Sequence, residues 1–572
     1  MSSRPTLALL AGCTLWVLPA FSPAQPTAPA LGGESIPRVL ELLAEDFAAH
    51  DAGVVSSVPP SARAEAAAAY AEGIQHLKNR DWTRALARFR QSATADPAQP
   101  LAPIHAALCL ALTGQPDPAR ALLAEALQRQ PRSPELLAAS AALHSLASEW
   151  KSAASQAESS RARQPHLLAN YHVLAQAALS QKQPARIRQL FTLSLQSTPP
   201  APAPIHYTRL AALWAGLLPL DGKTTPSQAL REVQPFLAKA EALDPGNIAL
   251  QSQSGMVAFA AGDFALAATR LEEVHRARPH LAEVREKLAL AYIQTARPAQ
   301  AIPLVEAIIH DAPHRHGLHL ALGELHGKTG QWDRAADAYA AYHQLGAPNA
   351  QTLFALAESQ LNARRLDDAL ATIRGAQIKH PSVPAFAYLR ALVLHLQERH
   401  GDALTAFVEA EALATPNYTA MLDRDFYFRK GLAAEYAKDD AAMEAAFKRC
   451  LALQPDDHET MNHLGYTWAE RGVRLDEALK LIQRAVELDP DNGAYLDSLA
   501  WVYYQKGDAK RALPWILKAA AQLPDDPVIL EHLGDIHAKA GQPDKARAAW
   551  TRALEKNPAR ADEIRQKLNP RT

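Results

Sequence analysis

The sequence predicts an all-α fold built as a solenoid of about 14 helix-turn-helix units, and three observations predict it. Alanine supplies much of the 48% hydrophobic share, whereas aromatic residues reach only 6%. Such a composition favours closely packed helices over a large aromatic core. No segment shows the alternation of apolar and polar residues that is typical of a half-buried strand. A proline also recurs at a nearly constant interval along most of the chain.

The recurring proline sets the length of the repeat. We expect each proline to follow the second helix of a pair, because its ring cannot continue a helix and disfavours helical geometry in the preceding residue. Most intervals are 34 residues, and intervals of 46 and 39 residues indicate insertions near residues 217–228 and 419–424. The insertions either decorate the solenoid or mark a local break, and we favour decoration. The prolines are Pro97, Pro131, Pro165, Pro199, Pro245, Pro279, Pro313, Pro348, Pro381, Pro416, Pro455, Pro490, Pro524 and Pro558.

Glycine and large apolar residues recur at fixed places in the best-formed units. A mid-helix glycine costs about 1 kcal/mol relative to alanine, so Gly255, Gly323, Gly431, Gly465 and Gly534 indicate points where two helices approach closely. A second glycine in each unit is expected to end the first helix, because glycine readily adopts turn geometry. The large apolar residues expected to fill the space between neighbouring units are Phe89, Leu271, Tyr339, Phe407, Phe447 and Trp550.

The 34-residue period resembles that of tetratricopeptide repeats (TPRs), and the best units also match the residue pattern of that family. His463-Leu464-Gly465-Tyr466, for example, is followed by Trp468, Ala478 and Asp489-Pro490. The resemblance covers residues 66–558. It implies a right-handed superhelix whose concave groove is lined by the first helix of each unit. Residues 559–572 have no partner unit, and we expect Asp562–Leu568 to form a C-terminal capping helix followed by a short tail.

The first 24 residues resemble a secretory signal peptide. Arg4 supplies a positive charge, residues 6–21 are mostly apolar, and small residues precede a cut before Gln25. An alternative lies inside this segment, because Leu10-Ala11-Gly12-Cys13 resembles a lipoprotein signal in which Cys13 would carry lipid. Both interpretations predict a periplasmic or secreted protein, and the second adds an outer-membrane anchor, which would be the chain's one attachment to a membrane.

Residues 25–65 are expected to form a tether that contains one short amphipathic helix. The segment from 26 to 35 is rich in proline, glycine and alanine. The segment from 36 to 50 then has the periodicity of a helix with one apolar side. Its apolar residues are Ile36, Val39, Leu40, Leu43 and Phe47.

The sequence offers little room or chemistry for catalysis. The repeats leave too few residues at either end for an enzyme fold, and no nucleophile-elbow, Walker, H-E-x-x-H or C-x-x-C motif is present. With 59 basic and 60 acidic residues, the chain lacks the positive charge that nucleic-acid binding needs. We therefore expect no enzyme activity, cofactor, nucleic acid or small-molecule substrate. A run of histidines favours solvated or packed side chains over a metal site, and its members are His310, His314, His316, His319 and His326.

A stripe of aromatic, acidic and amide residues on the first helices of the last three units is the candidate partner-binding site. Tyrosine and tryptophan are enriched at binding hot spots because they bury a large area at little entropic cost. The alternative is that Trp501 and Tyr504 only fill gaps between adjacent helices. The candidate residues are Asn462, Tyr466, Asp497, Trp501, Tyr504, Glu531 and Asp535.

Residues from Thr460 to Pro558 resemble one family more closely than the generic repeat. The stretch from Asn462 to Leu479 and the stretch from Asp489 to Tyr504 are similar to the C-terminal part of bacterial envelope TPR lipoproteins. The resemblance implies a periplasmic adaptor, for instance for a carboxy-terminal processing protease or its substrates. The alternative is a structural scaffold of an outer-membrane secretion or polysaccharide-assembly complex.

Overall fold

The computed structural model describes residues 37–47, 58–199, 201–346, 348–414, 418–556 and 561–569. Regular structure in these ranges consists of α-helices and two short 3-10 turns, without a strand, so the predicted all-α fold is confirmed. The predicted signal peptide, with both candidate cleavage positions and Cys13, lies outside the described residues. The described residues fall into two compact units that divide between Pro313 and His314.

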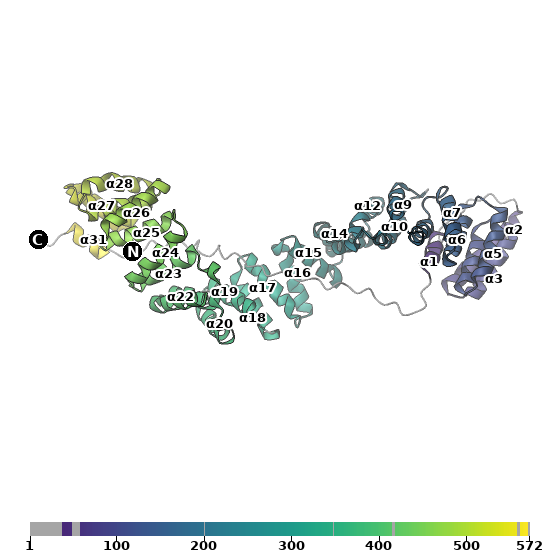
Figure 1. Cartoon of the computed structure of the whole chain (residues 1–572), viewed down its shortest axis with the longest axis horizontal. Helices are drawn as coiled ribbons and strands as arrows, with labels where there is room; N and C mark the ends of the chain where they lie inside the picture. The colour runs from purple at the N-terminus through teal and green to yellow at the C-terminus, as the bar shows by residue number, and fades with distance from the viewer. Residues whose placement is uncertain are drawn as a thin grey trace. The chain divides into compact units, whose positions relative to one another are not determined.

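The N-terminal unit begins with an isolated helix and continues with helix pairs (Figure 1). Its helices are α1 (Arg38–Phe47), α2 (Pro60–Lys78), α3 (Trp82–Ala95), α4 (Leu101–Leu112), α5 (Pro116–Arg129), α6 (Pro134–Leu146), α7 (Trp150–Arg161), α8 (Leu168–Ser180), α9 (Ala185–Gln196), α10 (Pro204–Leu217), the 3-10 turn η1 (Leu218–Asp221), α11 (Pro226–Glu232), α12 (Gln234–Leu243), α13 (Ile248–Ala260), α14 (Phe264–Ala277), α15 (Ala282–Gln294) and α16 (Pro298–Asp311).

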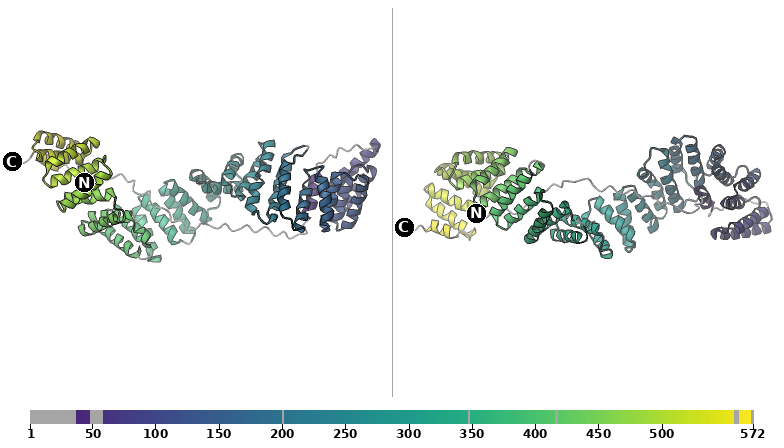
Figure 2. Two further views of the ribbon diagram at one scale, coloured as in Figure 1. Left: turned by 45° about the horizontal axis from the view of Figure 1, so that its top comes forward. Right: turned by 60° about the horizontal axis from the view of Figure 1, so that its bottom comes forward.

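The C-terminal unit repeats the same arrangement, and Figure 2 shows its stacked pairs from two further sides. Its elements are α17 (His316–Lys328), α18 (Trp332–Leu345), α19 (Ala350–Asn362), α20 (Leu366–Lys379), α21 (Pro384–Leu396), α22 (His400–Ala414), η2 (Thr419–Met421), α23 (Arg424–Tyr436), α24 (Asp440–Leu453), α25 (His458–Glu470), α26 (Leu475–Leu488), α27 (Gly493–Gln505), α28 (Ala509–Gln522), α29 (Pro527–Lys539), α30 (Pro543–Lys556) and α31 (Ala561–Leu568).

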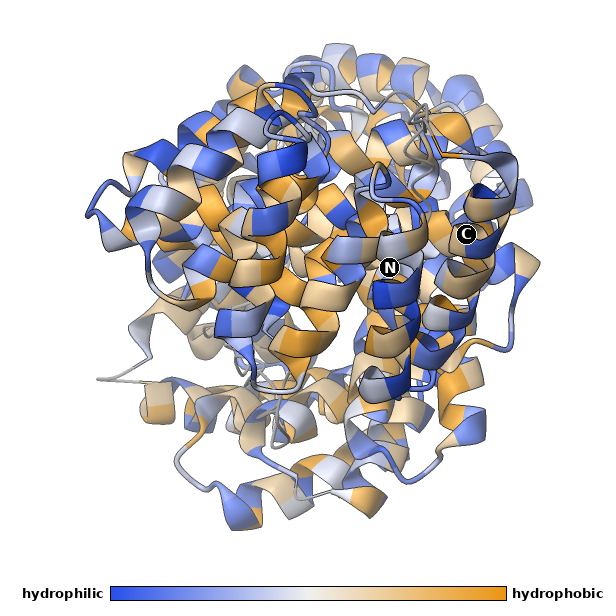
Figure 3. Ribbon diagram, turned by 90° about the vertical axis from the view of Figure 1, so that its right-hand side faces the viewer, coloured by the Kyte–Doolittle hydropathy of each residue, from blue (hydrophilic) through white to orange (hydrophobic). Residues whose placement is uncertain are grey.

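The helices from α2 to α30 form fourteen pairs in the described ranges, with α10 pairing to α12, which agrees with the predicted number of units. Most first helices pack chiefly on the second helix of their own pair and next on the neighbouring pair, whereas α4 and α8 pack more on the pair before them. Figure 3 shows that individual helices carry both apolar and polar residues, as expected where only part of each helix is buried. Stability therefore comes from stacking neighbours rather than from one central core.

The mid-helix glycines lie where the two helices of a pair approach closely, as predicted. A Cβ atom on Gly323 would stand 2.8 Å from the ring of Tyr339, and one on Gly255 would stand 2.7 Å from Leu271. The large apolar residues contact the next pair, as expected, since the rings of Phe89 and Phe447 lie 5.1 Å from those of His105 and His463. They also lie against the glycine sixteen residues earlier in their own pair, which the sequence analysis did not predict. The same register joins Gly73 to Phe89, Gly431 to Phe447 and Gly534 to Trp550.

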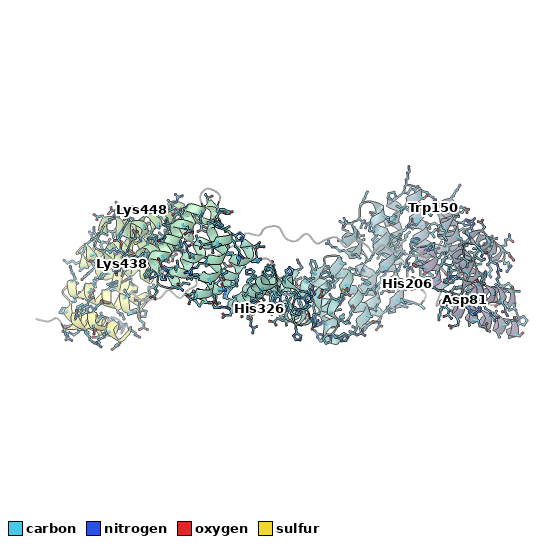
Figure 4. The ribbon with its side chains drawn as sticks, turned by 90° about the horizontal axis from the view of Figure 1, so that it is seen from below. Asp81, Trp150, His206, His326, Lys438 and Lys448 are labelled. Atoms are coloured by element: carbon cyan, nitrogen blue, oxygen red, sulfur yellow. The ribbon has the colours of Figure 1, made fainter. Side chains whose placement is uncertain are left out.

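The turn between the helices of a pair places one residue in the left-handed region, and this residue recurs with the repeat. Glycine occupies it in six pairs, as at Gly330 and Gly507, because glycine adopts this geometry without strain. In other pairs the same position holds a residue with a Cβ atom, for which the left-handed region costs roughly 1–2 kcal/mol. Those residues are Arg80, Ser148, Lys182, Ala296, Arg364, Glu398 and Lys438, the last of which is labelled in Figure 4.

Replacing Ala296 with glycine is expected to stabilise the N-terminal unit by about 1 kcal/mol, because it removes this strain. Ala296 is exposed and has a φ of 55°, so no packing is lost. Urea unfolding followed by circular dichroism would measure the change. Ala124→Gly is the control, because Ala124 is exposed within α5 and the same substitution there should destabilise by about 1 kcal/mol. Equal effects at the two positions would contradict the prediction.

The insertion in the fifth pair folds into η1 and the beginning of α11. Asp221 holds the turn by accepting hydrogen bonds from the backbone N–H groups of Lys223 and Thr224, both at 2.7 Å. Arg188 of α9 donates to Thr224 at 2.6 Å and also pairs with Glu232 of α11. The insertion is therefore anchored to the preceding pair. The second insertion contains η2, which precedes α23.

The C-terminal helix α31 covers the last pair. Ile564 is fully buried and clusters with Leu530 of α29 and Ala553 of α30. The structure thus places a helix at the residues where the sequence analysis expected a cap, and this helix shields the apolar surface that a fifteenth pair would otherwise cover.

Candidate partner-binding site

The predicted stripe lies on the first helices of three successive pairs in the C-terminal unit. These helices begin where an Asp or Asn side chain caps them, which satisfies backbone N–H groups that have no partner within the helix. Asp457 accepts from Thr460 at the start of α25, Asn492 from Ala494 at the start of α27, and Asp526 from Val528 at the start of α29. The stripe consists of Asn462 and Tyr466 on α25, Asp497, Trp501 and Tyr504 on α27, and Glu531 and Asp535 on α29.

Three aromatic rings stack at the centre of the stripe. The rings of Tyr504 and Trp501 are nearly parallel, with centroids 4.8 Å apart and an interplanar angle of 17°. On its other side Trp501 stacks on His532, with centroids 3.9 Å apart and an angle of 16°. Lys539 lies over the Tyr504 ring at 5.4 Å, and the Tyr466 ring lies 6.4 Å from His532. The stack thus joins α25, α27 and α29 into one surface.

Asp497 lies beneath the stack, where it fixes His532. The Nδ1 atom of His532 is 2.9 Å and 3.1 Å from the two carboxylate oxygens of Asp497. Asp497 and His532 are each only 5% exposed, so a ligand in the groove would meet Trp501 and Tyr504 rather than the carboxylate or the imidazole ring. Asp497 therefore orients the stack and does not present itself to solvent.

His532 belongs to the site although the sequence analysis did not select it. Its signal in the sequence is its place directly before Leu533-Gly534, since His463 holds the same place before Leu464-Gly465. His463 also pairs with a carboxylate of the preceding pair, at 2.7 Å from Glu435. A histidine that recurs at one repeat position opposite an acidic residue of the preceding pair is thus a sign of an inter-repeat contact.

The acidic end of the stripe is joined to α31. Lys567 donates hydrogen bonds to Glu531 and Asp535, both at 2.7 Å, and Trp550 Nε1 donates to Asp535 at 2.9 Å. Burial opposes the charge on Lys567, but its hydrogen bonds to both carboxylates outweigh burial and raise the pKa of the lysine. Glu531 is only 2% exposed. These two acidic residues therefore hold the capping helix in place.

Two polar groups on the stripe have no hydrogen-bond partner in the described part of the chain. They are the side-chain amide oxygen of Asn462 and the indole N–H of Trp501, and both are buried atoms. A buried polar group without a partner costs roughly 1–3 kcal/mol. A bound peptide could relieve that cost, because its backbone offers both a donor and an acceptor at each residue. The residues that line the surface but remain partly exposed are Asn462, Tyr466, Trp501, Tyr504 and Asp535.

Neither a cluster of three metal-ligating side chains nor a membrane-spanning helix occurs among the described residues. Within the residues that the structure describes, no three His, Cys, Asp or Glu side chains gather closely enough to hold a metal ion. His326, labelled in Figure 4, is buried. Across the same residues, we find no helix with both the length and the apolar character needed to cross a bilayer. Burial raises the pKa of the thiols of Cys109 and Cys450 to about 12, as expected for packed side chains.

Four family models, all described as tetratricopeptide repeats, match residues 76–143, 258–325, 354–419, 425–457, 470–527 and 527–560. These ranges cover more than half of the chain and fall on the helix pairs described above. The chain is a tetratricopeptide repeat protein. This confirms the resemblance seen in the sequence, and TPR proteins as a class mediate contacts between proteins.

This TPR protein is 31% identical to TPR repeat-containing protein PA4667 of Pseudomonas aeruginosa over 220 residues. The match covers 38% of this chain and 36% of that protein, so the chain spans about a third of that relative's length. It is also 33% identical to Photosystem I assembly protein Ycf3 of Prochlorococcus marinus over 101 residues, covering 15% of this chain and 56% of the relative.

The chain is also similar, at low sequence identity, to solved structures. YrrB is described as a TPR protein with an unusual peptide-binding site and is 22% identical. The match covers 36% of this chain and 100% of YrrB, with a TM-score of 0.31. The Cut9–Hcn1 hetero-tetramer is 13% identical over 81% of this chain and 95% of its own, with a TM-score of 0.32.

Proposed function

We propose that this protein is a non-catalytic adaptor of the bacterial cell envelope that binds a partner protein through the stripe on α25, α27 and α29. The observation that supports it most is that Trp501 and Tyr504 stay partly exposed within the Tyr504–Trp501–His532 stack, where the Trp501 indole N–H and the Asn462 amide oxygen have no partner. A bound peptide would recover the free energy that these two groups cost in the free protein.

The proposed ligand is an extended segment of the partner. One side chain would pack on the exposed face of Tyr504, since tyrosine offers a large, stiff contact surface. The peptide backbone would donate to the Asn462 amide oxygen and accept from the Trp501 indole after a small rotation of these side chains. Lys567 already donates to Glu531 and Asp535, and Trp550 also donates to Asp535, so the ligand needs no donor at that end.

The envelope location rests on the N-terminal segment and on the resemblance of residues 460–558 to envelope TPR lipoproteins. In this proposal the partner is a carboxy-terminal processing protease or a substrate delivered to it. A peptide that begins at Gln25 in mass spectrometry of the mature protein would indicate soluble export. A lipid-modified N-terminus at Cys13 would instead indicate an anchored adaptor.

Tyr504→Ala is expected to weaken partner capture about tenfold, as loss of a modest hot spot does. Tyr503→Ala is the matched control. Tyr503 precedes Tyr504 on α27, but its hydroxyl accepts a hydrogen bond from Gln483 of α26, on the side away from the stripe. Capture from envelope extracts with each variant, quantified by mass spectrometry, measures the difference. Circular dichroism of both variants should match the unmodified protein.

Two outcomes of that capture would contradict the adaptor. Equal loss of partner in Tyr503→Ala and Tyr504→Ala would show that the aromatic residues of α27 act through stability alone. Recovery of porin-like or polysaccharide-synthase subunits without any protease would favour a structural scaffold of an outer-membrane secretion or polysaccharide-assembly complex.

A further inference from the structure

The short helix α1 lies on the first helices of the N-terminal unit rather than forming part of a helix pair. Its main contacts are with α4, α6 and α8, each the first helix of its pair, and Figure 1 shows α1 beside α6. It is separated from α2 by residues 48–59. First helices line the concave groove in this class of repeat, so α1 occupies the groove of its own unit.

The apolar side of α1 is buried in this groove almost completely. Leu40 and Leu43 lie beside Ile104 and Leu108 of α4 and Leu143 of α6, where they line the same small gap. A single helix of ten residues is not stable alone in water. Its helical form therefore depends on its packing in the groove. The buried apolar residues of α1 are Val39, Leu40, Leu42, Leu43 and Phe47.

A polar clamp holds the C-terminal end of α1. Asp46 accepts a hydrogen bond from the backbone N–H of Ala169, at the start of α8, at 3.0 Å. Arg209 of α10 donates to Asp46 at 3.0 Å and to the carboxylate of Glu45 at 2.9 Å. The side chain of Asp46 is only 2% exposed. Burial raises the pKa of Asp46 to about 7, although the hydrogen bonds from Ala169 and Arg209 act in the opposite direction. These two partners therefore stabilise the ionised form of the carboxylate.

We propose that the groove formed by α4, α6, α8 and α10 is a binding site for an amphipathic helix of another protein, and that α1 occupies it as an exchangeable internal ligand. The partner helix has the pattern of α1. Apolar residues stand at its positions 1, 2, 4, 5 and 9, as Val39 to Phe47 do, and an acidic residue at position 8 pairs with Arg209. This inference concerns the N-terminal unit and does not depend on the aromatic stripe.

Occupation by α1 sets the affinity that a partner needs. A ligand on the same chain has a high effective concentration, so a helix in solution competes against it at a disadvantage. A partner helix therefore binds only if its own contacts are stronger or if α1 is drawn out of the groove. The groove thus rejects weak amphipathic helices and admits those with both the apolar pattern and the carboxylate.

A labelled peptide of residues 37–47 tests the proposal on the full chain. Leu43→Asp places a charge on the buried side of α1 and should vacate the groove. Fluorescence anisotropy should then show peptide binding at least tenfold tighter to the Leu43→Asp protein than to the unmodified protein. A peptide carrying the same Leu43→Asp change is the control and should not bind. Equal affinity of the two proteins for the unmodified peptide would overturn the proposal.

A charge exchange tests the clamp separately. Arg209→Glu in the Leu43→Asp protein should weaken binding of the unmodified peptide about tenfold or more. A peptide with Asp46→Lys should bind this variant more tightly than it binds the protein that retains Arg209. If this reversal is absent, Arg209 does not bind the carboxylate of the helix, and the assignment of an acidic partner helix is overturned.

Hydrogen exchange of the unmodified chain gives a readout that does not depend on a variant folding. If α1 leaves the groove as a ligand does, it detaches while the helix pairs stay folded. Its amide hydrogens should then exchange at least tenfold faster than those of α6 and α8. Equal protection of α1, α6 and α8 would make α1 a fixed part of the unit and overturn the proposal. A dimer of the unmodified chain that dissociates on adding the peptide would also overturn it, since the partner would then be a second copy.

Discussion

Replacing Arg424 with methionine is expected to destabilise the C-terminal unit by about 3–5 kcal/mol, because it leaves a buried carboxylate without its counter-charge. Arg424 of α23 donates to both carboxylate oxygens of Asp457, at 2.6 Å and 3.0 Å. It also donates to Glu459 at 2.7 Å and lies 4.3 Å from the centre of the Phe428 ring. Asp457 has only 5% of its side chain exposed and caps α25. One substitution would thus weaken the contact between two neighbouring pairs.

The effect of Arg424→Met should depend on pH. Burial would raise the pKa of Asp457, but the hydrogen bonds from Arg424 and Thr460 outweigh it, so the pKa lies below its ordinary value of 3.8. A lowered pKa means that the ionised carboxylate stabilises the folded unit above about pH 4 and that this contribution is lost as the pH falls through the folded-state pKa. In the variant, Asp457 loses the hydrogen bonds and charge of Arg424 and keeps only those from Thr460 against burial, so its pKa should rise and protonation should relieve part of the cost. The difference in the free energy of unfolding between the unmodified protein and Arg424→Met should therefore be smaller at low pH.

Urea unfolding at pH 7 and at pH 4 measures both effects. Arg484→Met is the control, because Arg484 pairs with Asp456 and Glu487 at the surface, where all three side chains are about half exposed or more. Exposed pairs contribute little to stability, so this variant should unfold at nearly the same urea concentration as the unmodified protein. A loss in Arg484→Met as large as that in Arg424→Met would contradict the argument from burial.

Gly431→Leu is expected to destabilise the C-terminal unit by about 3 kcal/mol, the upper part of the usual range for overpacking. A Cβ atom on Gly431 would lie 2.5 Å from the Phe447 ring. That ring is fully buried and is held between Phe428 and His463, with centroids at 5.6 Å and 5.1 Å. Because the ring cannot move aside, α23 and α24 would have to separate. The higher helix propensity of leucine offsets only about 1 kcal/mol of this cost.

The same substitution at Gly375 separates packing from helix propensity. Gly375 lies within α20, is exposed, and a Cβ atom there would have no atom within 4 Å among its described surroundings. Gly375→Leu should therefore stabilise the unit slightly, by up to about 1 kcal/mol. The urea concentration at the midpoint of unfolding should fall in Gly431→Leu and rise slightly in Gly375→Leu. Heteronuclear NMR spectra should show changes around α23 and α24 in Gly431→Leu only. Destabilisation by both would mean that the glycines serve a purpose other than close approach.

The sequence was sufficient to predict the repeat itself. Proline at the end of each unit and glycine opposite a large apolar residue are local features that recur every 34 residues. Their chemistry acts within one pair, as the contact of Gly323 with Tyr339 shows. For that reason the number of pairs, the helical class and the points of close approach followed from spacing. At the candidate site, the contacts that the sequence did not predict are those between residues of different pairs.

The candidate site shows this limit clearly. The sequence analysis selected Trp501 and Tyr504 from their place on the first helix, and the structure brings them into one stack. It did not select His532, because the stacking partner belongs to the next pair. Nor could it show that Lys567 of α31 covers Glu531, since that contact depends on how the capping helix folds back. Whether these residues bind a partner remains a prediction of the sequence and a proposal here.

The sequence by itself determined that the chain is a series of helix pairs and that a short amphipathic helix precedes them. Only the tertiary structure decided where that helix goes. Asp46 meets the backbone of Ala169 across 123 residues of sequence, and Arg209 lies further still along the chain. Periodicity describes contacts between neighbours in sequence. It contains no information on which groove an isolated apolar helix will enter, because that choice depends on the shape and charge of a surface assembled from four separate pairs.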